Sequence, residues 1–232
     1  MSRIVKAHDE RRQEILQTAQ RLFYTKGYDQ TSIQDIIDAV GIAKGTFYHY
    51  FGSKSELLNE LVEQLLVEAL QHLEPLVQDG EPGAIEKFNR FFREALTWKT
   101  QHREFLLGML RSYYSDDNAV LREKLTRSTL QAVAPLLTKL IQQGVAEGVF
   151  DVESPEETAS IVLSMGQWWS DTVGHALLET AGGGDLLQRI EGQLDALHQA
   201  IERVLGAPRG SLRLIDKAAL REWVTPSSEE IP

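Results

Sequence analysis

The fold of this chain is decided by the stretch Ser32-Ile-Gln-Asp-Ile-Ile-Asp-Ala-Val-Gly-Ile-Ala-Lys-Gly-Thr-Phe-Tyr-His-Tyr50. Ser32 stands three residues before Asp35, which is the spacing of a capping pair at the start of a helix. Gly41 permits a sharp turn, because glycine adopts backbone conformations that other residues avoid. The spacing therefore predicts two short helices, 32–40 and 44–50, joined by a tight turn, and this is the layout of a helix-turn-helix.

An amphipathic helix precedes this stretch and gives the two short helices a surface to pack on. Apolar residues recur at positions 15, 16, 19, 22 and 23, on one helical face, and Gly27 is a natural end for that helix. Within the stretch, apolar side chains stand where the short helices must pack on the first one, at Ile36, Val40, Ile42 and Phe47. The polar residues of the third helix are thereby left on its outer side.

The outer side of this third helix carries groups that suit DNA. A helix fits the major groove of B-DNA, and its N-terminal residues reach the base edges. Lys44 offers a charge to phosphate or guanine, Thr46 offers a hydroxyl or a methyl group, and Tyr48 and His49 suit phosphate oxygens. Lys54 stands near the start of the next helix, where a phosphate is also favoured. The alternative is a plain three-helix packing unit that touches no DNA, which would leave these outward side chains without a purpose.

The run Gly41-Ile-Ala-Lys-Gly-Thr-Phe-Tyr-His-Tyr-Phe-Gly-Ser-Lys-Ser-Glu-Leu57 resembles the TetR family of bacterial regulators. The usual run in that family is Gly-Val-Ser-Lys-Gly-Thr-Leu-Tyr-His-His-Phe-x-Ser-Lys-x-Glu-Leu, and the resemblance extends over residues 9–61. The sequence departs from it at Ala43, where the family usually has a serine as helix N-cap. The resemblance implies a homodimeric, usually repressive DNA-binding regulator with a ligand-responsive helical C-terminal domain. It places the DNA contacts of the family on Thr31, Gln34, Lys44, Gly45, Thr46, Tyr48, His49 and Lys54.

The charge of the chain is divided unevenly. The 232 residues carry a net charge of −10, yet residues 1–55 have eight basic and six acidic side chains, a balance of +2, and the remaining residues sum to −12. A mildly basic head on an acidic body would orient itself toward a polyanion such as double-stranded DNA. Chance asymmetry is the alternative explanation for a segment of this size.

The composition excludes several classes of protein. Hydrophobic residues make up 42% and charged residues 25%, as in ordinary globular domains. No apolar run approaches the ~18–20 residues of a membrane span, and the first ten residues lack the apolar core of a secretory signal. With no cysteine there is no disulfide, thiolate nucleophile or Cys-ligated zinc. We therefore expect a cytoplasmic protein.

Beyond residue 53 the sequence predicts further helices and no strands. A long helix begins at the Ser53–Glu56 capping pair, and Pro75 with residues 79–83 should end it. Helices are expected at 84–101, 103–114, 117–148 (kinked or interrupted at Pro135), 154–181 and 185–205, with a possible short helix at 213–223. We predict an all-α fold of about nine helices, divided into a helix-turn-helix domain (1–55), a helical ligand-binding and dimerisation domain (56–206) and a C-terminal tail (207–232) without an assigned role.

The last two long helices are the expected dimer interface. In the family resembled, such a pair usually forms a four-helix bundle across the two-fold axis. Trp168 and Trp169 are adjacent and must point in different directions, so one of them needs a second surface. The alternative is that the apolar stripes are the core of a single chain. The residues expected at the interface are Trp169, Val173, Leu177, Leu194, Leu197 and Ile201.

An effector site is expected among the helices of the body. The aromatic and polar groups available there suit a flat or lipophilic molecule, although aromatic residues also dominate ordinary cores. The candidates are Trp98, His102, Phe105, Met109, Tyr113, Trp168 and His175. His102 and His175 are not accompanied by further ligands at the spacing of a zinc site, so we predict neither a metal nor a cofactor.

Three hypotheses for the function follow. The first is a transcription regulator in which an effector changes the spacing of two recognition helices and so releases DNA. The second is a DNA-binding protein that answers to a protein partner or acts constitutively, and the sequence does not separate it from the first. The third is an all-α enzyme, which we do not predict because the sequence has no paired carboxylates in a recognisable frame, no nucleophile motif and no phosphate-cradling loop.

Overall fold

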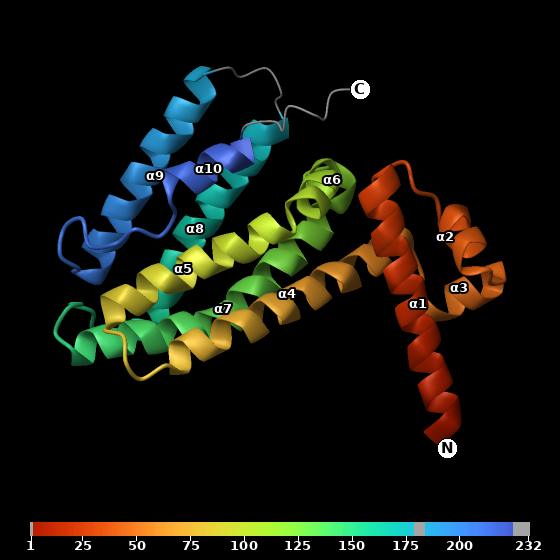
Figure 1. Ribbon diagram of the computed structural model, residues 1–232, viewed down its shortest axis with the longest axis horizontal. Helices are drawn as coiled ribbons and strands as arrows, with labels where there is room; N and C mark the ends of the chain where they lie inside the picture. Colours follow the sequence, from red (N-terminus) through yellow and green to blue (C-terminus); the bar gives the residue numbers. More distant parts are fainter. Residues whose placement is uncertain (1, 179–183, 225–232) are drawn as a thin grey trace. The chain divides into compact units, whose positions relative to one another are not determined.

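The computed structural model describes residues 2–178 and 184–224 of the chain. Within these ranges the protein is all-helical, which confirms the predicted fold class, and it has ten α-helices and one short 3-10 helix. The predicted end of the eighth helix near residue 181 lies outside these ranges. The elements labelled in Figure 1 are α1 (Ser2–Lys26), α2 (Ile33–Val40), α3 (Lys44–Tyr50), α4 (Lys54–Gln78), α5 (Ala84–Gln101), α6 (Arg103–Tyr113), α7 (Ala119–Ala146), α8 (Pro155–Leu178), α9 (Gly184–Leu205) and α10 (Lys217–Val224); the 3-10 helix η1 spans Asp116–Asn118.

The chain divides into two compact units. The first unit consists of residues 1–67 and 104–125, and the second consists of residues 68–103 and 126–232. The first unit therefore holds the expected helix-turn-helix domain together with the start of α4, most of α6 and the start of α7. The second unit holds α5, α8, α9 and α10 with the remainder of α4 and α7.

The core of the first unit is formed where α2 and α3 pack on α1 (Figure 1). The predicted apolar face of α1 is buried, and each short helix contributes large apolar side chains to it. Removal of this apolar surface from water is the main stabilising contribution to such a small helical unit. The buried side chains include Ile15, Leu16, Ala19, Phe23, Ile36, Ile37, Phe47 and Phe51.

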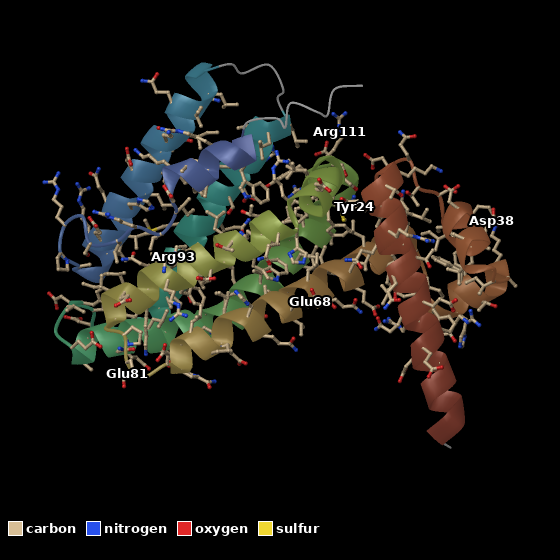
Figure 2. All side chains as sticks on the ribbon, viewed as in Figure 1. Tyr24, Asp38, Glu68, Glu81, Arg93 and Arg111 are labelled. Atoms are coloured by element: carbon tan, nitrogen blue, oxygen red, sulfur yellow. The ribbon has the colours of Figure 1, made fainter. Side chains whose placement is uncertain are left out.

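A buried polar cluster holds the α6–η1 corner in the first unit. The Asn118 side-chain amide donates to the Ser112 carbonyl at 3.0 Å, and its Oδ1 accepts a hydrogen bond from the Ser55 hydroxyl at the start of α4 at 3.4 Å. The hydroxyl of Tyr24, labelled in Figure 2, donates to Glu104 at the start of α6. Because buried polar groups need partners, the Asn118 bonds fix the α6–η1 corner to α4, and the exposed Tyr24 bond joins α6 to α1 within this unit.

The second unit has one continuous apolar core. α8 and α9 lie side by side, and α5, α7 and the segment after α9 complete the core around them (Figure 1). Phe88 packs edge-on against Phe150, with ring centroids 5.7 Å apart. The core residues include Phe88, Phe91, Leu137, Leu140, Ile141, Phe150, Val162, Trp169, Ile190, Leu194 and Ile201.

Neither proline interrupts its helix, and the predicted connection at residues 79–83 is present. α4 runs through Pro75 to Gln78, and α7 runs through Pro135 without interruption. A proline removes one backbone N–H donor from a helix but leaves its own carbonyl as an acceptor. The Pro75 carbonyl accepts a hydrogen bond from the Asp79 N–H at 3.1 Å, so the last turn of α4 is completed in spite of the proline. The connection between α4 and α5 therefore begins only after Gln78.

The described part of the tail belongs to the core of the second unit. Leu212, Leu214 and Leu220 are buried, and the buried Glu202 carboxylate accepts a hydrogen bond from the Leu212 N–H at 3.0 Å. The indole N–H of Trp223 on α10 donates to the Thr100 hydroxyl on α5 at 2.8 Å. No helix in the described ranges has the length and apolarity that a membrane crossing requires.

Candidate nucleic-acid interface

The start and end of α2 are fixed by its own sequence. The Ser32 hydroxyl accepts a hydrogen bond from the Asp35 N–H at 3.1 Å, and the Asp35 carboxylate accepts one from the Ser32 N–H at 2.7 Å, which completes a capping box. Gly41 ends the helix with a φ of 74°, in the left-handed region where a side chain would be strained. The predicted turn is therefore present, and it sets the direction in which α3 leaves α2.

Asp35 also ties α2 to the end of α1. The Lys26 ammonium donates to the Asp35 carboxylate at 2.8 Å. This hydrogen bond from Lys26, together with those from the Ser32 backbone and hydroxyl, holds the pKa of Asp35 well below its usual range. Three donors around one carboxylate thereby position the two-helix element on α1.

α3 presents one apolar side chain to the core and polar groups to the outside. Phe47 is fully buried, whereas Lys44, Gly45 and His49 are exposed and the Tyr48 side chain is 46% exposed. Ala43 precedes the helix and makes no side-chain capping bond, as expected from its departure from the family pattern. The half-buried Thr46 completes a surface that offers a cation, hydroxyl groups and imidazole to a ligand.

Gln34 extends this surface onto α2. Its side chain is exposed, and its amide donates to the Asp38 carboxylate one helical turn later at 2.7 Å. Asp38 is labelled in Figure 2, where it lies on the side of α2 that faces away from α1. The amide oxygen of Gln34 is an acceptor available for a base edge or a bridging water.

Two of the eight expected contact residues, Thr31 and Lys54, make hydrogen bonds within the scaffold. Thr31 is fully buried, and its hydroxyl donates to the Gly27 carbonyl at 2.7 Å. The Lys54 ammonium donates to the carbonyls of Tyr28 and Thr31, each at 2.9 Å, and lies 4.1 Å from the centre of the Tyr28 ring. Burial lowers the pKa of Lys54. The Lys54 side chain thereby holds α4 to the loop that follows α1, and the Thr31 hydroxyl fastens this loop to its own start.

The structure adds one residue that the sequence analysis did not select. The ring of His8 on α1 lies 5.6 Å from the ring of His49 and 4.6 Å from the ring of Tyr50, measured between centroids. His8 is exposed and stands seven residues before the apolar face of α1 begins. No spacing rule connects positions 8 and 49, because only the packing of α1 on α3 brings them together.

The expected effector residues are divided between the two units. Phe105 and Met109 are buried in the first unit, where Tyr113 is half-buried. Trp98, His102, Trp168 and His175 belong to the second unit, and of these Trp98 and His102 stack with ring centroids 4.2 Å apart. The seven side chains therefore do not form one cluster within either unit.

The residues expected at the dimer interface are mostly core residues of the single chain. Trp169, Val173, Leu194, Leu197 and Ile201 are buried in the second unit, and Leu177 packs against the same core. The two adjacent tryptophans do point in different directions, but Trp168 is the exposed one, which is the reverse of the expected assignment.

The exposed side of α8 and α9 instead forms an apolar groove of about 660 Å³. The side chains of Ile161 and Trp168 are 50% and 57% exposed there. The groove is lined by Ser160, Ile161, Ser164, Met165, Trp168, Gln193, Ala196, Leu197 and Ala200.

Comparison with known proteins connects both parts of the chain to one family. Residues 15–61 match the family model described as bacterial regulatory proteins, tetR family, and residues 110–175 match the model described as tetracyclin repressor-like, C-terminal domain. The chain is 30% identical over 146 residues to the HTH-type transcriptional regulator EthR of Mycolicibacterium smegmatis, which covers 56% of this chain and 67% of that protein.

Two further likenesses extend over most of the chain. The chain is 24% identical over 196 residues to the HTH-type transcriptional repressor DhaR of Mycobacterium sp. strain GP1, which covers 84% of this chain and 91% of that protein. The crystal structure of a TetR-family transcriptional regulator from Pectobacterium atrosepticum superposes with a TM-score of 0.66 at 23% identity, covering 87% of this chain and 97% of that one. This structural likeness shows a common fold.

Proposed function

Since this chain belongs to the TetR family of bacterial regulatory proteins, we propose that it acts as a homodimeric repressor that binds an inverted-repeat operator and is released by a small-molecule effector. A DNA-binding transcriptional regulator is the function common to its relatives. The repressor mode is supported by DhaR, a transcriptional repressor that aligns with 84% of the chain. We place its action in the cytoplasm, where bacterial DNA is accessible.

The observation that carries this proposal is the exposure of α3 on a scaffold that fixes its direction. The helix buries Phe47 and turns Lys44, Gly45, Tyr48 and His49 outward. A cation, a glycine that allows close approach and hydroxyl groups are the chemistry of base and phosphate contact. The capping box of α2 and the turn at Gly41 fix the two ends of α2 and the direction in which α3 leaves it.

Selection of random double-stranded oligonucleotides by the purified full chain tests the proposal. We expect enrichment of an inverted repeat whose half-sites are about one helical turn, ~34–36 Å, or a multiple of it apart. Affinity for the enriched duplex should fall steeply between 50 and 200 mM salt because phosphate contacts release counterions. Failure to enrich any sequence at either salt concentration would contradict a sequence-reading regulator.

For the homodimer, we propose that a second copy covers the groove between α8 and α9. The groove exposes Ile161 and Trp168, and large exposed apolar patches mark interaction sites. The side-chain oxygen of Gln193 in the same groove is buried without a hydrogen-bond partner in the single chain, so a donor from a second copy would satisfy it. A self-complementary groove of this kind suits a two-fold interface, in which both copies use the same residues.

The mass of the protein in solution tests the interface. We expect twice the 26.1 kDa of the chain for the wild type, and the monomer mass for Trp168→Asp, because a buried unpaired carboxylate would oppose association. Val145→Asp on α7 is the matched control, since Val145 is also an exposed apolar residue but lies outside the groove. A wild-type monomer, or a Trp168→Asp dimer, would exclude this groove as the interface.

For the effector, we propose a flat or lipophilic molecule bound by aromatic side chains of the second unit. The stacked pair Trp98 and His102 supports this proposal, because an aromatic surface suits an aromatic ligand. A regulator controlled by a protein partner, or a constitutive one, is the second candidate. A compound that raises the melting temperature of the protein and releases it from the operator would support the effector-controlled regulator. A wide library that contains no such compound would favour the protein-controlled or constitutive regulator.

A further inference from the structure

The ammonium group of Lys54 lies against the loop that joins α1 to α2. It donates to the carbonyls of Tyr28 and Thr31, each at 2.9 Å, and lies 4.1 Å from the centre of the Tyr28 ring. An ammonium group has three N–H donors, and a cation within about 6 Å of a ring centre is attracted to the face of the ring. Two carbonyls and one aromatic face therefore hold the charged end of Lys54 inside the first unit.

Lys54 joins the two ends of the α2–α3 pair. Thr31 directly precedes Ser32, the N-cap of α2, whereas Lys54 is the first residue of α4, the helix that follows α3. The hydrogen bond from Lys54 to the Thr31 carbonyl thus closes a loop of chain that contains both short helices. Closing such a loop restricts the conformations that are open to the enclosed segment. The side chain therefore closes the α2–α3 pair at its base.

Both sides of this closure are held by local hydrogen bonds. On the α4 side, the Ser53 hydroxyl accepts a hydrogen bond from the Glu56 N–H at 3.0 Å, which caps the first turn of the helix. On the loop side, the Thr31 N–H donates to the Tyr28 carbonyl at 3.1 Å. The two carbonyls that receive Lys54 thus belong to one tight turn, and the lysine ties this turn to the capped start of α4.

We infer that Lys54 is a positioning residue: its ammonium closes the base of the α2–α3 pair, fixes the direction of α3 and makes no contact with a DNA phosphate. The family resemblance implies a DNA contact at Lys54, so the inference gives this residue a different role. It rests on the proposed function, because the direction of α3 matters to a protein that reads base edges with this helix. Burial lowers the pKa of Lys54, although the charge of Asp29 opposes this effect, in agreement with an ammonium group partly withdrawn from water.

A positioning role and a phosphate contact have different effects on DNA affinity. A phosphate contact strengthens binding to all sequences alike, and its loss lowers the slope of log affinity against log salt by about 0.9 per phosphate. A positioning residue acts on the alignment of α3 with the base edges, which carry the sequence information. Its loss therefore weakens binding to the operator more than binding to a duplex of unrelated sequence.

The experiment uses the full chain and two labelled duplexes of equal length, the enriched operator and a mixed sequence, titrated between about 50 and 200 mM salt. Lys54→Met keeps the apolar stem and removes the ammonium. Lys54→Gln keeps an amide donor for a carbonyl and carries the test if Lys54→Met does not fold. Lys139→Met is the matched control, because Lys139 is an exposed lysine of α7 in the second unit. Circular dichroism establishes that each variant is folded before the titration.

For Lys54→Met we expect the affinity for the operator to fall at least about tenfold, a part of the usual ratio between specific and non-specific binding. The affinity for the mixed-sequence duplex and its slope against salt should keep their wild-type values. Lys54→Gln should lose less affinity for the operator, and Lys139→Met should match the wild type. A lysine that only stabilises the fold would change the melting temperature and leave the ratio of the two affinities unchanged.

The inference is overturned if Lys54→Met weakens binding to both duplexes equally and lowers the salt slope by about 0.9 per copy, because Lys54 would then contact a phosphate. An unchanged ratio of the two affinities also overturns it. Failure of the proposed function gives a different result, since the wild type would then enrich no operator. In that case the mixed-sequence duplex still decides the role of Lys54: a lowered salt slope in Lys54→Met overturns the inference, and an unchanged slope supports the assignment of the ammonium to the scaffold.

Discussion

Gly144 allows Phe150 to close the core of the second unit. A Cβ atom at Gly144 would lie 2.0 Å from Cδ2 of Phe150, far inside the contact distance of two carbon atoms. Phe150 is buried and packs against Phe88, so its ring is not free to move aside. A close-packed interior of this kind transmits the strain of even one added methyl group to its neighbours.

Gly144→Ala is therefore expected to destabilise the protein by roughly 1–3 kcal/mol, the usual cost of overpacking a core. The matched control is Gly192→Ala, because a Cβ at this other helical glycine would meet no atom within 4 Å. The control should leave the stability unchanged or raise it by roughly 0.5–1 kcal/mol, since alanine is the better helix former. Urea denaturation of both variants measures the difference. Equal stabilities would contradict the packing of Phe150 on α7.

Asp35 carries a prediction about acid stability. Its pKa is held below the usual range first by the Lys26 hydrogen bond and then by Ser32. A carboxyl group with a lowered pKa in the folded state stabilises that state above its unfolded pKa, and the contribution is lost as the pH falls toward the folded pKa. Asp35→Asn should lower the melting temperature at pH 7, and its difference from the wild type should shrink below about pH 4, near the ordinary pKa of an aspartate side chain.

Thermal melts of the wild type and Asp35→Asn between pH 3 and pH 7 measure this effect. Asp38→Asn is the control, because the Asp38 carboxylate accepts its hydrogen bond from Gln34 on the same helix α2. A melting-temperature difference for Asp35→Asn that stays constant down to pH 3 would show that its carboxylate charge is not what ties α2 to α1.

The sequence could predict some residues of the candidate nucleic-acid interface and not others. The outward positions of α3 were predictable, because helical spacing and one buried phenylalanine assign them. Thr31 and Lys54 were not, since their polarity suggests exposure while backbone carbonyls at the end of α1 bind them. His8 could not be found either, because its contact with α3 is a product of tertiary packing.

At the scale of elements, the bounds of the short helices and the connection at residues 79–83 were predictable, whereas the continuation of α4 past Pro75 was not. A capping box and a left-handed glycine are local signals, and α2 begins and ends where these signals stand, whereas α3 begins after Ala43 without a side-chain cap and ends before the extended Phe51. α4 continues past Pro75 because the turn after the proline still forms its hydrogen bonds. Tertiary packing of an amphipathic face stabilises a helix more than a single lost bond destabilises it.

The sequence did not predict that the segment after α9 belongs to the core of the second unit. Its apolar residues are too few for a helical stripe, but three leucines are buried and Asn89 on α5 bonds both the Ser211 carbonyl and the Arg213 N–H, at 2.9 and 2.6 Å. These bonds fix an irregular segment against α5, which only a tertiary structure reveals. The described part of the tail is therefore a structural element of the second unit.

Leu220→Ala is expected to cost roughly 2–5 kcal/mol of stability, as for other buried leucines, because α10 would lose its contact with the core. Arg213→Ala is the matched control in the same segment, since the Arg213 side chain is exposed and its N–H contact to Asn89 is retained. The control should remain within ±0.5 kcal/mol of the wild type. A Leu220→Ala protein as stable as the wild type in urea would mean that α10 is detached in solution.

At the scale of the whole molecule, both the uneven charge and the division into two units indicate that the N-terminal part of the chain faces DNA. The chain has a net charge of −10, but residues 1–55 are slightly basic, so repulsion from DNA acts mainly on the body and attraction on the head. A single α3 helix reads only a few base pairs, which is too little for specific binding at physiological salt. Specific binding of the proposed operator would therefore need the proposed homodimer, whose groove residues lie far from α3 in the sequence.

This requirement gives the last prediction. Trp168→Asp, which we expect to separate the copies, should lower the affinity for a complete inverted repeat by at least about 100-fold, because two linked half-sites bind far more tightly than one. The affinity of Trp168→Asp for a duplex with a single half-site should equal that of the wild-type protein for the same duplex. The reason is that Trp168 lies in the second unit, whereas α3 and its scaffold lie in the first. Val145→Asp should bind both duplexes like the wild type. A monomeric Trp168→Asp that still binds the complete repeat with full affinity would contradict this prediction. Each copy would then read its half-site independently, and the α8–α9 groove would not be what holds two recognition helices at one spacing.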